Sequence, residues 1–219
     1  MRLVLTPGNC RTQSSYNVIG DLKGSENPEQ VVIVSGHLDS WDLGTGAIDD
    51  GAGVAVAMQA ANLVKQLGLK PRRTIRVIAW MNEENGLRGG TTYAAEHAAE
   101  VANHFGAIET DGGADHPIGI YFGPRREMKA FLQPVAQVLT ASGAGNIEAR
   151  DHIGADIDPL FKLGVPISAR FRTAASILTT ITRRRTRSTR SIRINWPKMR
   201  RSMLSSLHAL ANLQQPLPR

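Results

Sequence analysis

Residues 31–42 read VVIVSGHLDSWD, and this stretch decides the fold. Val31 to Ser35 form a continuous apolar, β-branched run of the kind that becomes a strand covered on both faces. His37 and Asp39 follow at the carboxyl end of that strand. The pattern predicts an α/β fold in which helices lie on each side of a sheet.

Two further apolar runs deliver polar side chains in the same way. Residues 74–81, TIRVIAWM, precede Glu83 and Glu84, and residues 104–110, HFGAIET, precede Asp111. Open α/β sheets bind ligands in the crevice beyond the carboxyl ends of their strands. We therefore expect these side chains to meet at one edge of a three-layer α/β/α fold, whose central sheet is mixed and mostly parallel.

The rest of the chain alternates in the manner of that fold, without internal repeats. Residues 17–24 are expected to form a strand next to 31–35, with the polar residues 25–30 as the turn between them. Apolar spacing and flanking Gly and Pro residues predict helices over four segments. These are residues 54–67, 86–101, 128–139 and a short turn at 159–163.

The residue types at the strand ends suit a hydrolytic metal centre. One imidazole with several carboxylates and no cysteine favours Zn²⁺, with Mn²⁺ or Co²⁺ as alternatives. The carboxylates exceed the needs of one zinc, which favours two metal ions bridged by one carboxylate. Asp49, in the glycine-rich loop GAIDDGAG at 46–53, is the natural bridge. Glu83 would then act as the general base and Glu84 as a ligand.

Taken singly, each of these motifs has an ordinary structural explanation. A lone His-x-Asp is usually a hydrogen-bonded histidine, and Glu83-Glu84 alone is usually a solvated loop pair. Asp49-Asp50-Gly51 alone is typical of a turn with a helix cap. Their joint occurrence, in this order and after three apolar runs, favours the metal centre.

From about Tyr16 to Ile167 the chain resembles the co-catalytic di-zinc exopeptidases, which include zinc aminopeptidases and the carboxypeptidase Q (plasma glutamate carboxypeptidase) group. The resemblance is carried by five segments, SGHLDSWD, GAIDDGAG, NEENGLRGG, IETDGG and GADIDPLFKLGVPI. The paired glutamates and these segments match the peptidases more closely than glutaminyl cyclases, which share the fold. The resemblance implies hydrolysis of terminal peptide bonds in dipeptides or short peptides, at the amino or the carboxyl end.

The resemblance also implies a role for each residue. His37 and Asp111 would be terminal ligands of the two metals, Asp49 the bridge, Glu84 a ligand and Glu83 the base. Asp39 would orient His37 through its second ring nitrogen, and the Asp49-Asp50 peptide would be cis. Outside this set, His152 is expected near the substrate pocket, and Tyr121, Phe122 and Gly123 are candidates for its wall or for a structural strand. His97, His104 and His116 are not expected to be ligands.

The family's remaining ligand is a histidine in a segment like Tyr-His-His-Thr, and this segment is missing. The amino-acid composition of the chain also changes after Ile167. Residues 168–219 hold 12 of the 26 Lys and Arg residues and none of the 19 Asp and Glu residues. The basic excess therefore belongs to the tail, whereas the body of the chain is net acidic. A basic arm for nucleic acid or another acidic surface is one explanation of such a block.

A frameshift in the coding sequence is the explanation that we favour. If the third base of each codon is read with the first two of the next, residues 170–196 decode as VSDGSLYFDYHHTPEDTLDKIDPHQL with permitted codons throughout. This reading contains the missing segment, and its second histidine straddles the codons of Ile181 and Thr182. Arg183-Arg184-Arg185 is accordingly not interpreted as a nuclear-targeting or RNA-binding motif.

The frameshift divides the chain into three parts. On this interpretation, residues 1–167 would be the catalytic domain, expected to be shorter at the amino end than in the family. Residues 168–205 would be an aberrant basic segment, and 206–219 a remnant of the final helix and carboxyl terminus. The altered segment is expected to lack the last zinc ligand and the strand after Ile167, so the polypeptide as written would be weakly active or inactive. His208, the only histidine downstream, is expected to be structural. A non-catalytic remnant or basic-tailed binding protein is the alternative function.

Composition adds few constraints on partners and location. The chain has 219 residues, 42% of them hydrophobic, which suits a single α/β domain. The sequence predicts neither a signal peptide nor a transmembrane run, and Cys10 is the only cysteine. Relatives are mostly secreted or periplasmic. A peptide is the expected partner, without nucleic acid or membrane, and a homodimer remains an option.

Overall fold

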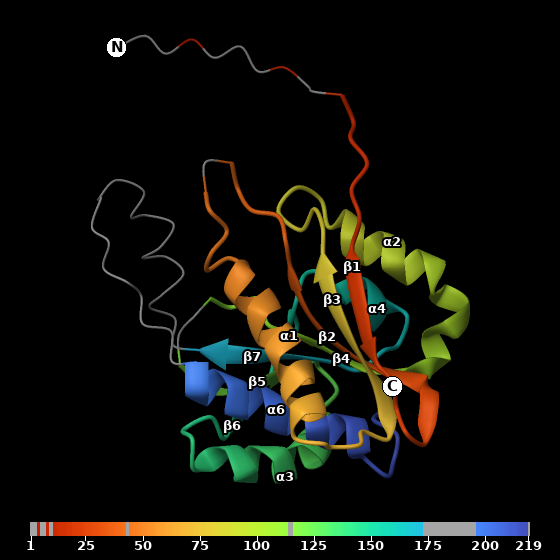
Figure 1. The fold of residues 1–219 in the computed structure, drawn as a ribbon, viewed down its shortest axis with the longest axis vertical. Helices are drawn as coiled ribbons and strands as arrows, with labels where there is room; N and C mark the ends of the chain where they lie inside the picture. The colour runs from red at the N-terminus through yellow and green to blue at the C-terminus, as the bar shows by residue number, and fades with distance from the viewer. Residues whose placement is uncertain are drawn as a thin grey trace.

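The structure, a computed structural model, describes residues 4, 8, 11–42, 44–113, 116–172 and 196–218. The described strands form a seven-stranded sheet in the order β1-β3-β2-β4-β7-β5-β6 (Figure 1). β2 is parallel to β3 and β4, β7 is parallel to β4, and β6 is parallel to β5, whereas β1 and β5 run antiparallel to β3 and β7. The predicted mixed, mostly parallel sheet is confirmed. The strands are β1 Val18–Leu22, β2 Asn27–His37, β3 Arg73–Trp80, β4 His104–Glu109, β5 Pro117–Phe122, β6 Asn146–Ala149 and β7 Ile167–Arg172.

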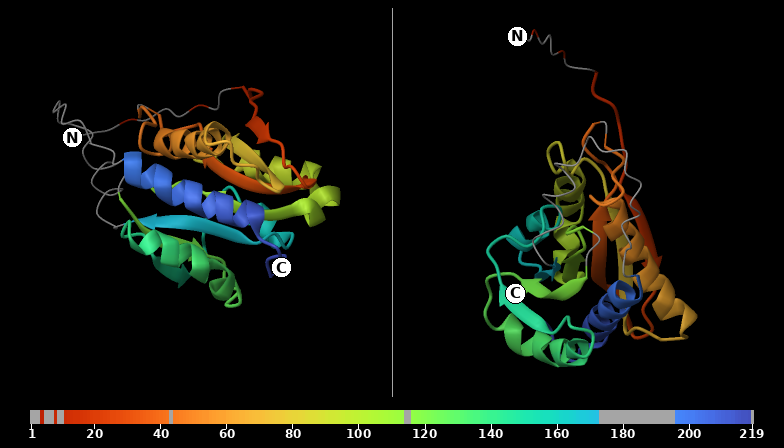
Figure 2. Two further views of the ribbon diagram at one scale, coloured as in Figure 1. Left: turned by 60° about the horizontal axis from the view of Figure 1, so that its bottom comes forward. Right: turned by 90° about the vertical axis from the view of Figure 1, so that its left-hand side faces the viewer.

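Helices cover both faces of the sheet, as the three-layer prediction requires (Figures 1 and 2). Alternate residues of β2 explain why both faces need cover, since Val32 and Val34 enter one apolar cluster and Val31 and Ile33 the other. Helices α1, α3 and α6 pack on the first face and α2 and α4 on the second. The helices are α1 Gly51–Gln66, α2 Arg88–Glu96, the 3-10 helix η1 Ala98–Asn103, α3 Met128–Thr140, α4 Asp158–Lys162 and α6 Trp196–Asn212.

Two expectations about strands are wrong. β1 is not a neighbour of β2, because β3 lies between them. Asn17 fixes this arrangement, since its side chain accepts from the Met81 N–H at 3.0 Å and donates to the Gly89 carbonyl at 3.0 Å. The strand after Gly164-Val165-Pro166 also forms despite the altered composition, because β7 pairs with both β4 and β5.

The last helix closes the first apolar cluster. α6 begins at Trp196, ten residues before the segment 206–219 that the sequence marks as the helical remnant, and it packs against α1 and α3. Its described side chains Met203, Leu207 and Ala211 are fully buried. Residues 173–195, which hold most of the frameshift reading and Arg183-Arg184-Arg185, lie outside the described residues. Among the described helices none is long and apolar enough to cross a membrane.

Burial of α6 gives a direct test of its packing. Leu207→Ala is expected to lower the free energy of unfolding by about 2–5 kcal/mol, because it removes a fully buried side chain and leaves a cavity. Leu163→Ala, at a leucine that is 42% exposed, is the control and should change it by less than about 0.5 kcal/mol. Urea denaturation of the three chains measures both values. Equal midpoints for the two variants would contradict the packing of α6.

Candidate metal centre

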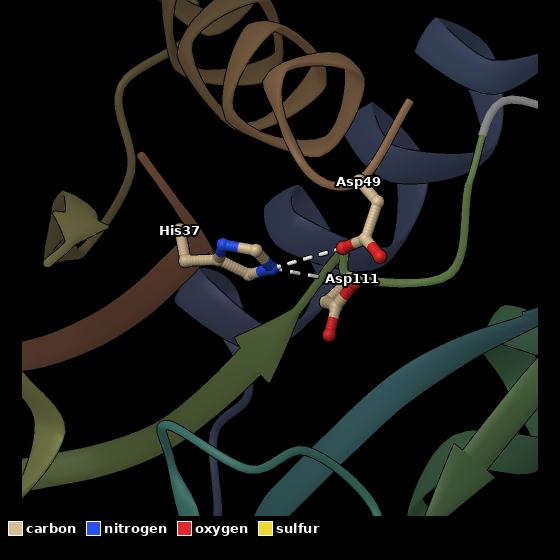
Figure 3. Close-up of side chains that lie close together, drawn as sticks. All are labelled: His37, Asp49 and Asp111. Carbon is tan, nitrogen blue, oxygen red and sulfur yellow. Dashed lines mark hydrogen bonds and ion pairs between the residues drawn. The ribbon is translucent and has the colours of Figure 1, made fainter. Parts of the chain in front are cut away.

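His37 ends β2 and turns its ring toward two carboxylates (Figure 3). The residue is 1% exposed. Its Nε2 lies 3.1 Å from Asp49 Oδ1 and 3.8 Å from Asp111 Oδ1. The three groups come from the end of β2, the loop before α1 and the segment after β4. Adjacent parallel strands thus bring together side chains that are distant in sequence.

The loop that carries Asp49 is fixed by its neighbour Asp50. The fully buried Asp50 caps α1, with Oδ1 accepting from Gly53 N–H at 3.2 Å and Oδ2 accepting from His37 N–H at 3.1 Å. A Cβ at Gly36 or Gly53 would clash with the Asp50 carboxylate, which explains both glycines. The Asp49-Asp50 peptide bond is cis, as the resemblance implies. The two explanations of this motif are therefore compatible, because Asp50 caps the helix while Asp49 faces His37.

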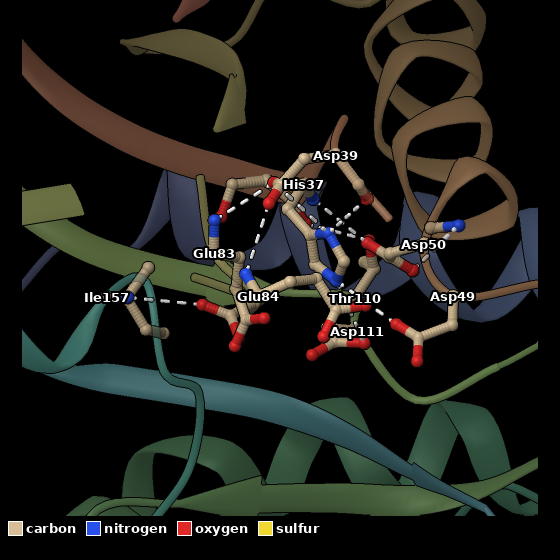
Figure 4. Close-up of polar contacts among 12 residues, drawn as sticks. His37, Asp39, Asp49, Asp50, Glu83, Glu84, Thr110, Asp111 and Ile157 are labelled. Atoms are coloured by element: carbon tan, nitrogen blue, oxygen red, sulfur yellow. Dashed lines mark hydrogen bonds and ion pairs between the residues drawn. The ribbon is translucent and has the colours of Figure 1, made fainter. Parts of the chain in front are cut away.

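Asp39 organises the glutamate pair that follows β3 (Figure 4). Its Oδ1 accepts from Glu83 N–H at 2.9 Å, and its Oδ2 accepts from Glu84 N–H at 3.1 Å. Toward His37, the main-chain oxygen of Asp39 is closer to Nδ1, at 3.0 Å, than its carboxylate is, at 3.7 Å. The residue thus faces the histidine with its carbonyl and positions the glutamates with its side chain.

The donor atoms form two overlapping sets, each compact enough for one cation. His37, Asp49 and Asp111 form one, His37, Glu83 and Glu84 the other, and the candidate atoms within each set lie within 4.8 Å of one another. Burial lowers the pKa of His37, but the hydrogen bond that its ring donates to Asp49 and the charges of Asp111, Asp50 and Glu83 raise it to about 10. The pocket therefore favours positive charge. An imidazole with several carboxylates is a donor set that suits zinc.

The electrostatics also distinguish the two glutamates from ordinary surface residues. Burial raises the pKa of Glu83, and the negative charges of Asp111 and Glu84 act in the same direction. Burial, followed by the charge of Asp49, raises the pKa of Glu84. A raised pKa moves a carboxylate toward the range that suits a general base near neutral pH.

Two buried carboxyl groups beside the centre escaped the sequence analysis. Glu109, at the end of β4, is 1% exposed and accepts from Ile157 N–H at 3.1 Å. Asp156 is fully buried, and neither side-chain oxygen has a hydrogen-bond partner among the described residues. Burial raises the pKa of Glu109 well above its usual value and that of Asp156 to about 8. Glu109 lies inside the IETDGG segment and Asp156 inside GADIDPLFKLGVPI, and their membership of these segments is the signal that could have drawn attention to them.

The remaining sequence candidates lie in different surroundings. His104 is hydrogen-bonded to the Tyr93 hydroxyl at 2.9 Å, and the His97 ring packs against the same tyrosine. Both histidines therefore lie beside the apolar cluster on the second face of the sheet. His152 lines a cavity together with Asp111. The described lining of this cavity does not include Tyr121, Phe122, Gly123 or His116. Phe122 is buried in the core, and His208 bonds Asn212 within α6.

Removing the Asp39 carboxylate is expected to weaken the centre without unfolding the domain. Asp39→Ala leaves the Glu83 and Glu84 amides without their acceptor, and we expect zinc affinity to fall about 10–100-fold. Asp39→Asn keeps one acceptor oxygen, so its zinc affinity should lie between that of Asp39→Ala and that of the parent. Competition with a fluorescent zinc chelator measures the affinities. Unchanged affinity in the alanine variant would show that the glutamate amides need no acceptor.

Comparisons with known proteins agree with this geometry. The model of peptidase family M28 matches residues 17–196. Carboxypeptidase Q of Xenopus laevis is 40% identical over 157 residues, which are 72% of this chain and 33% of that protein. Human carboxypeptidase Q is 38% identical over 152 residues, 69% of this chain and 32% of that protein. The chain thus spans about a third of the curated relatives that it matches.

Solved structures give the same assignment. A peptidase M28 precursor from Shewanella amazonensis superimposes with a TM-score of 0.77 and 33% identity, covering 94% of this chain and 47% of that one. A zinc aminopeptidase from Bacillus subtilis shares the fold, with a TM-score of 0.64 and 18% identity over 89% of this chain and 49% of that one. The names of these proteins agree with the zinc, hydrolase and metallopeptidase predictions. The family match covers most of the chain, which belongs to peptidase family M28.

Proposed function

We propose that this chain is the catalytic part of a di-zinc exopeptidase that hydrolyses terminal peptide bonds of dipeptides or short peptides. The observation that carries the proposal is the position of His37 between two sets of carboxylates, each compact enough for a metal ion. Two zinc ions would be held by His37, Asp49, Glu84 and Asp111. Asp49 lies 3.1 Å from the histidine on the open side of the cluster, which suits a bridging carboxylate.

Zinc bound there would polarise the scissile carbonyl and make a water molecule more acidic. The protein's own part is to move the proton and hold the groups in place. Glu83 would accept a proton from the attacking water and return it to the leaving amine. Asp39 holds the main chain of Glu83 and Glu84, so the base and its neighbour stay fixed relative to His37. The buried His37 ring excludes bulk water from one side of the site.

The chain as written lacks a candidate for the last ligand of the family. Residues 168–219 contain one histidine, His208, which bonds Asn212 on α6. β7 runs parallel to β4, so the chain leaves the sheet at the edge where the metal centre lies. A histidine placed some residues beyond β7 would therefore enter the site from the correct side. We propose that this ligand is lost by the frameshift and that activity is impaired.

Arg170 supports the frameshift from the core of the domain. It is 5% exposed on β7, and the small cavity that it lines is otherwise mostly apolar. Ile108, Ile120, Leu132, Val135 and Leu210 line that cavity. The alternative reading begins with valine at this position, an apolar residue like those that line the cavity.

Metal retention separates this function from a non-catalytic remnant or a basic-tailed binding protein. Purified chain is loaded with zinc, dialysed and analysed by mass spectrometry, alongside His37→Ala and the control His97→Ala. We expect up to one retained zinc in the parent and in the control, and none in His37→Ala. Peptidase activity on free, amino-blocked and carboxyl-amidated dipeptides then tests which terminus is read. Zinc that is retained equally by all three chains would overturn the assigned centre.

A further inference from the structure

A series of buried hydrogen bonds on the second face of the sheet ties α2 and η1 to β3 and β4. The Arg76 Nη1–H donates to the Tyr93 hydroxyl at 2.9 Å, and that hydroxyl lies 2.9 Å from His104 Nε2. The other ring nitrogen of His104 lies 3.2 Å from the Glu100 carbonyl oxygen. Tyr93 is 2% exposed and His104 is 1% exposed. Because His104 begins β4, this network lies at the opposite end of that strand from the metal centre.

The hydrogen-bond partners of His104 require a neutral ring. A carbonyl oxygen can only accept, so Nδ1 carries a proton and donates to Glu100. In a neutral imidazole Nε2 is then an acceptor, and the Tyr93 hydroxyl donates to it while accepting from Arg76. Donors and acceptors therefore match along the whole series only while His104 is uncharged.

A second proton on the ring would break this match. Nε2–H would face a hydroxyl oxygen that already accepts from Arg76, and the Tyr93 hydrogen would lose its acceptor in a buried place. The charged ring would also have the His97 ring near it, with 6.0 Å between the ring centroids. Burial lowers the pKa of His104, and the charges of His97 and Arg76 act in the same direction, whereas Glu100 opposes them. The folded chain thus favours the neutral form.

A cavity of about 320 Å³ adjoins the His104 ring and gives a protonated imidazole access to water and carboxylates. The charged groups that line it are Asp21, Lys23, Glu29, Arg76 and Glu100. Asp21 is paired with Arg76 at 2.8 Å, and the Glu100 side chain, which is 65% exposed, lies 3.4 Å from His97 Nδ1. An imidazolium that moved toward this cavity would therefore meet a favourable environment that the buried position lacks.

η1 is the element that such a movement would release. None of its residues is buried, and it is flanked by His97 at one end and His104 at the other. Segments with few buried contacts open at the lowest cost in free energy. The amino end of α2 has a separate anchor, because the Gly89 N–H donates to the Met81 carbonyl at 2.9 Å. Opening would thus be confined to η1 and the carboxyl end of α2.

We propose that His104 is an acid-sensitive latch, which holds η1 and the carboxyl end of α2 on the sheet when neutral and releases them when protonated. The latch goes beyond peptidase activity and does not depend on it. A pKa that is lowered by folding gives stability that is present above the ordinary histidine pKa of about 6.5. That stability is lost as the pH falls through the lower pKa of the folded chain, in the range where histidine switches act.

Amide hydrogen exchange of the full chain, followed by mass spectrometry at pH 7.5 and pH 5.5, tests the latch. After correction for the intrinsic pH dependence of exchange, we expect the protection of residues 93–103 to fall about 10-fold at the lower pH, as uptake of one proton on opening gives. Peptides from α3, which packs on the other face of the sheet, are the internal control and should keep their protection. Equal loss in both regions, or no loss in either, would overturn the proposal.

Two histidine variants assign the effect. His104→Gln stays uncharged and offers both an acceptor for Tyr93 and a donor for Glu100, so the protection of residues 93–103 should be equal at the two pH values. His97→Gln is the matched control, because this histidine lies beside the network without joining the buried series. It should keep the pH dependence of the parent. A pH dependence that persists in His104→Gln, or that disappears in His97→Gln, would contradict the latch.

Proton NMR of the parent chain gives a measurement that does not depend on how well the variants fold. The Cε1–H resonance of His104 is assigned through its contact with the Tyr93 ring, whose centroid lies 5.7 Å away, and is followed through a pH titration. We expect it to titrate below the ordinary histidine value of about 6.5, together with the loss of protection in η1. Titration at or above that value would overturn the proposal.

Zinc release at low pH is a separate event that the exchange measurement must distinguish from the latch. The exchange experiment is therefore run with excess zinc and again with excess chelator at both pH values. We expect the same fall in protection over residues 93–103 in both series, because the network lies at the other end of β4 from the metal centre. A fall that occurs only in the series with zinc would assign the effect to the metal centre and refute the latch.

Discussion

Replacing residues 170–196 with VSDGSLYFDYHHTPEDTLDKIDPHQL is expected to raise the zinc content from at most one ion per chain to two. The recovered segment begins in β7, beside β4, and continues from the sheet edge that carries His37 and Asp111. It restores a histidine and several acidic residues to a chain whose last 52 residues have no Asp or Glu. We expect kcat/KM for a dipeptide to rise at least about 100-fold, since losing a supporting contact alone costs 10–100-fold in affinity or activity.

Zinc analysis after dialysis and dipeptide turnover measure this result. The control is the same restored chain with the second histidine of the recovered pair changed to alanine, which should fall back toward the parent in both measurements. Circular dichroism establishes that the three chains are equally folded. Two zinc ions and full turnover in the unaltered chain would show that residues 168–205 are a functional tail and that the frameshift interpretation is wrong.

Glu83→Gln in the restored chain is expected to lower kcat about 10²–10⁴-fold while zinc content stays at two. The amide keeps the shape of the side chain but cannot accept a proton from water. Its main-chain N–H still donates to Asp39, so the loop geometry should persist. Steady-state kinetics and metal analysis are made on the same preparation.

Glu84→Gln is the matched comparison, because it lies one residue away and is held by the same carboxylate. It should lose zinc as well as turnover. Equal zinc loss in both variants would mean that Glu83 is a ligand, and unchanged turnover in Glu83→Gln would remove it from the proton transfer. The pair thus assigns the two roles that the sequence could only suggest together.

The site could be predicted because the apolar runs that form β2, β3 and β4 are visible in the local sequence. β2, β3 and β4 each end within a residue or two of the expected position. His37 ends β2, whereas Glu83 and Asp111 follow β3 and β4. Pairing partners were harder, because local sequence does not say which strand lies next to which. β1 joins β3 and not β2, and β7 forms from residues of unsuitable composition because β4 and β5 offer it partners on both sides.

The buried acids escaped for a related reason. Glu109 and Asp156 acquire their character from packing between β4 and the loop before α4, 48 residues apart at the Glu109–Ile157 hydrogen bond. No spacing rule links two such positions. Asp39 illustrates the same limit, because its proximity to His37 was expected whereas its two hydrogen bonds to the glutamate loop depend on how β2 and β3 align.

The packing of α6 against α1 has a consequence for how the protein comes into being. Helices α1 and α6 share one apolar cluster, so side chains near position 56 are not covered until residues near position 207 have been made. Contacts of such long sequence separation form late and slowly. During synthesis the whole of β2, β3 and β4 emerges before that cluster can close. The apolar faces of that cluster therefore stay uncovered during synthesis until α6 has been made.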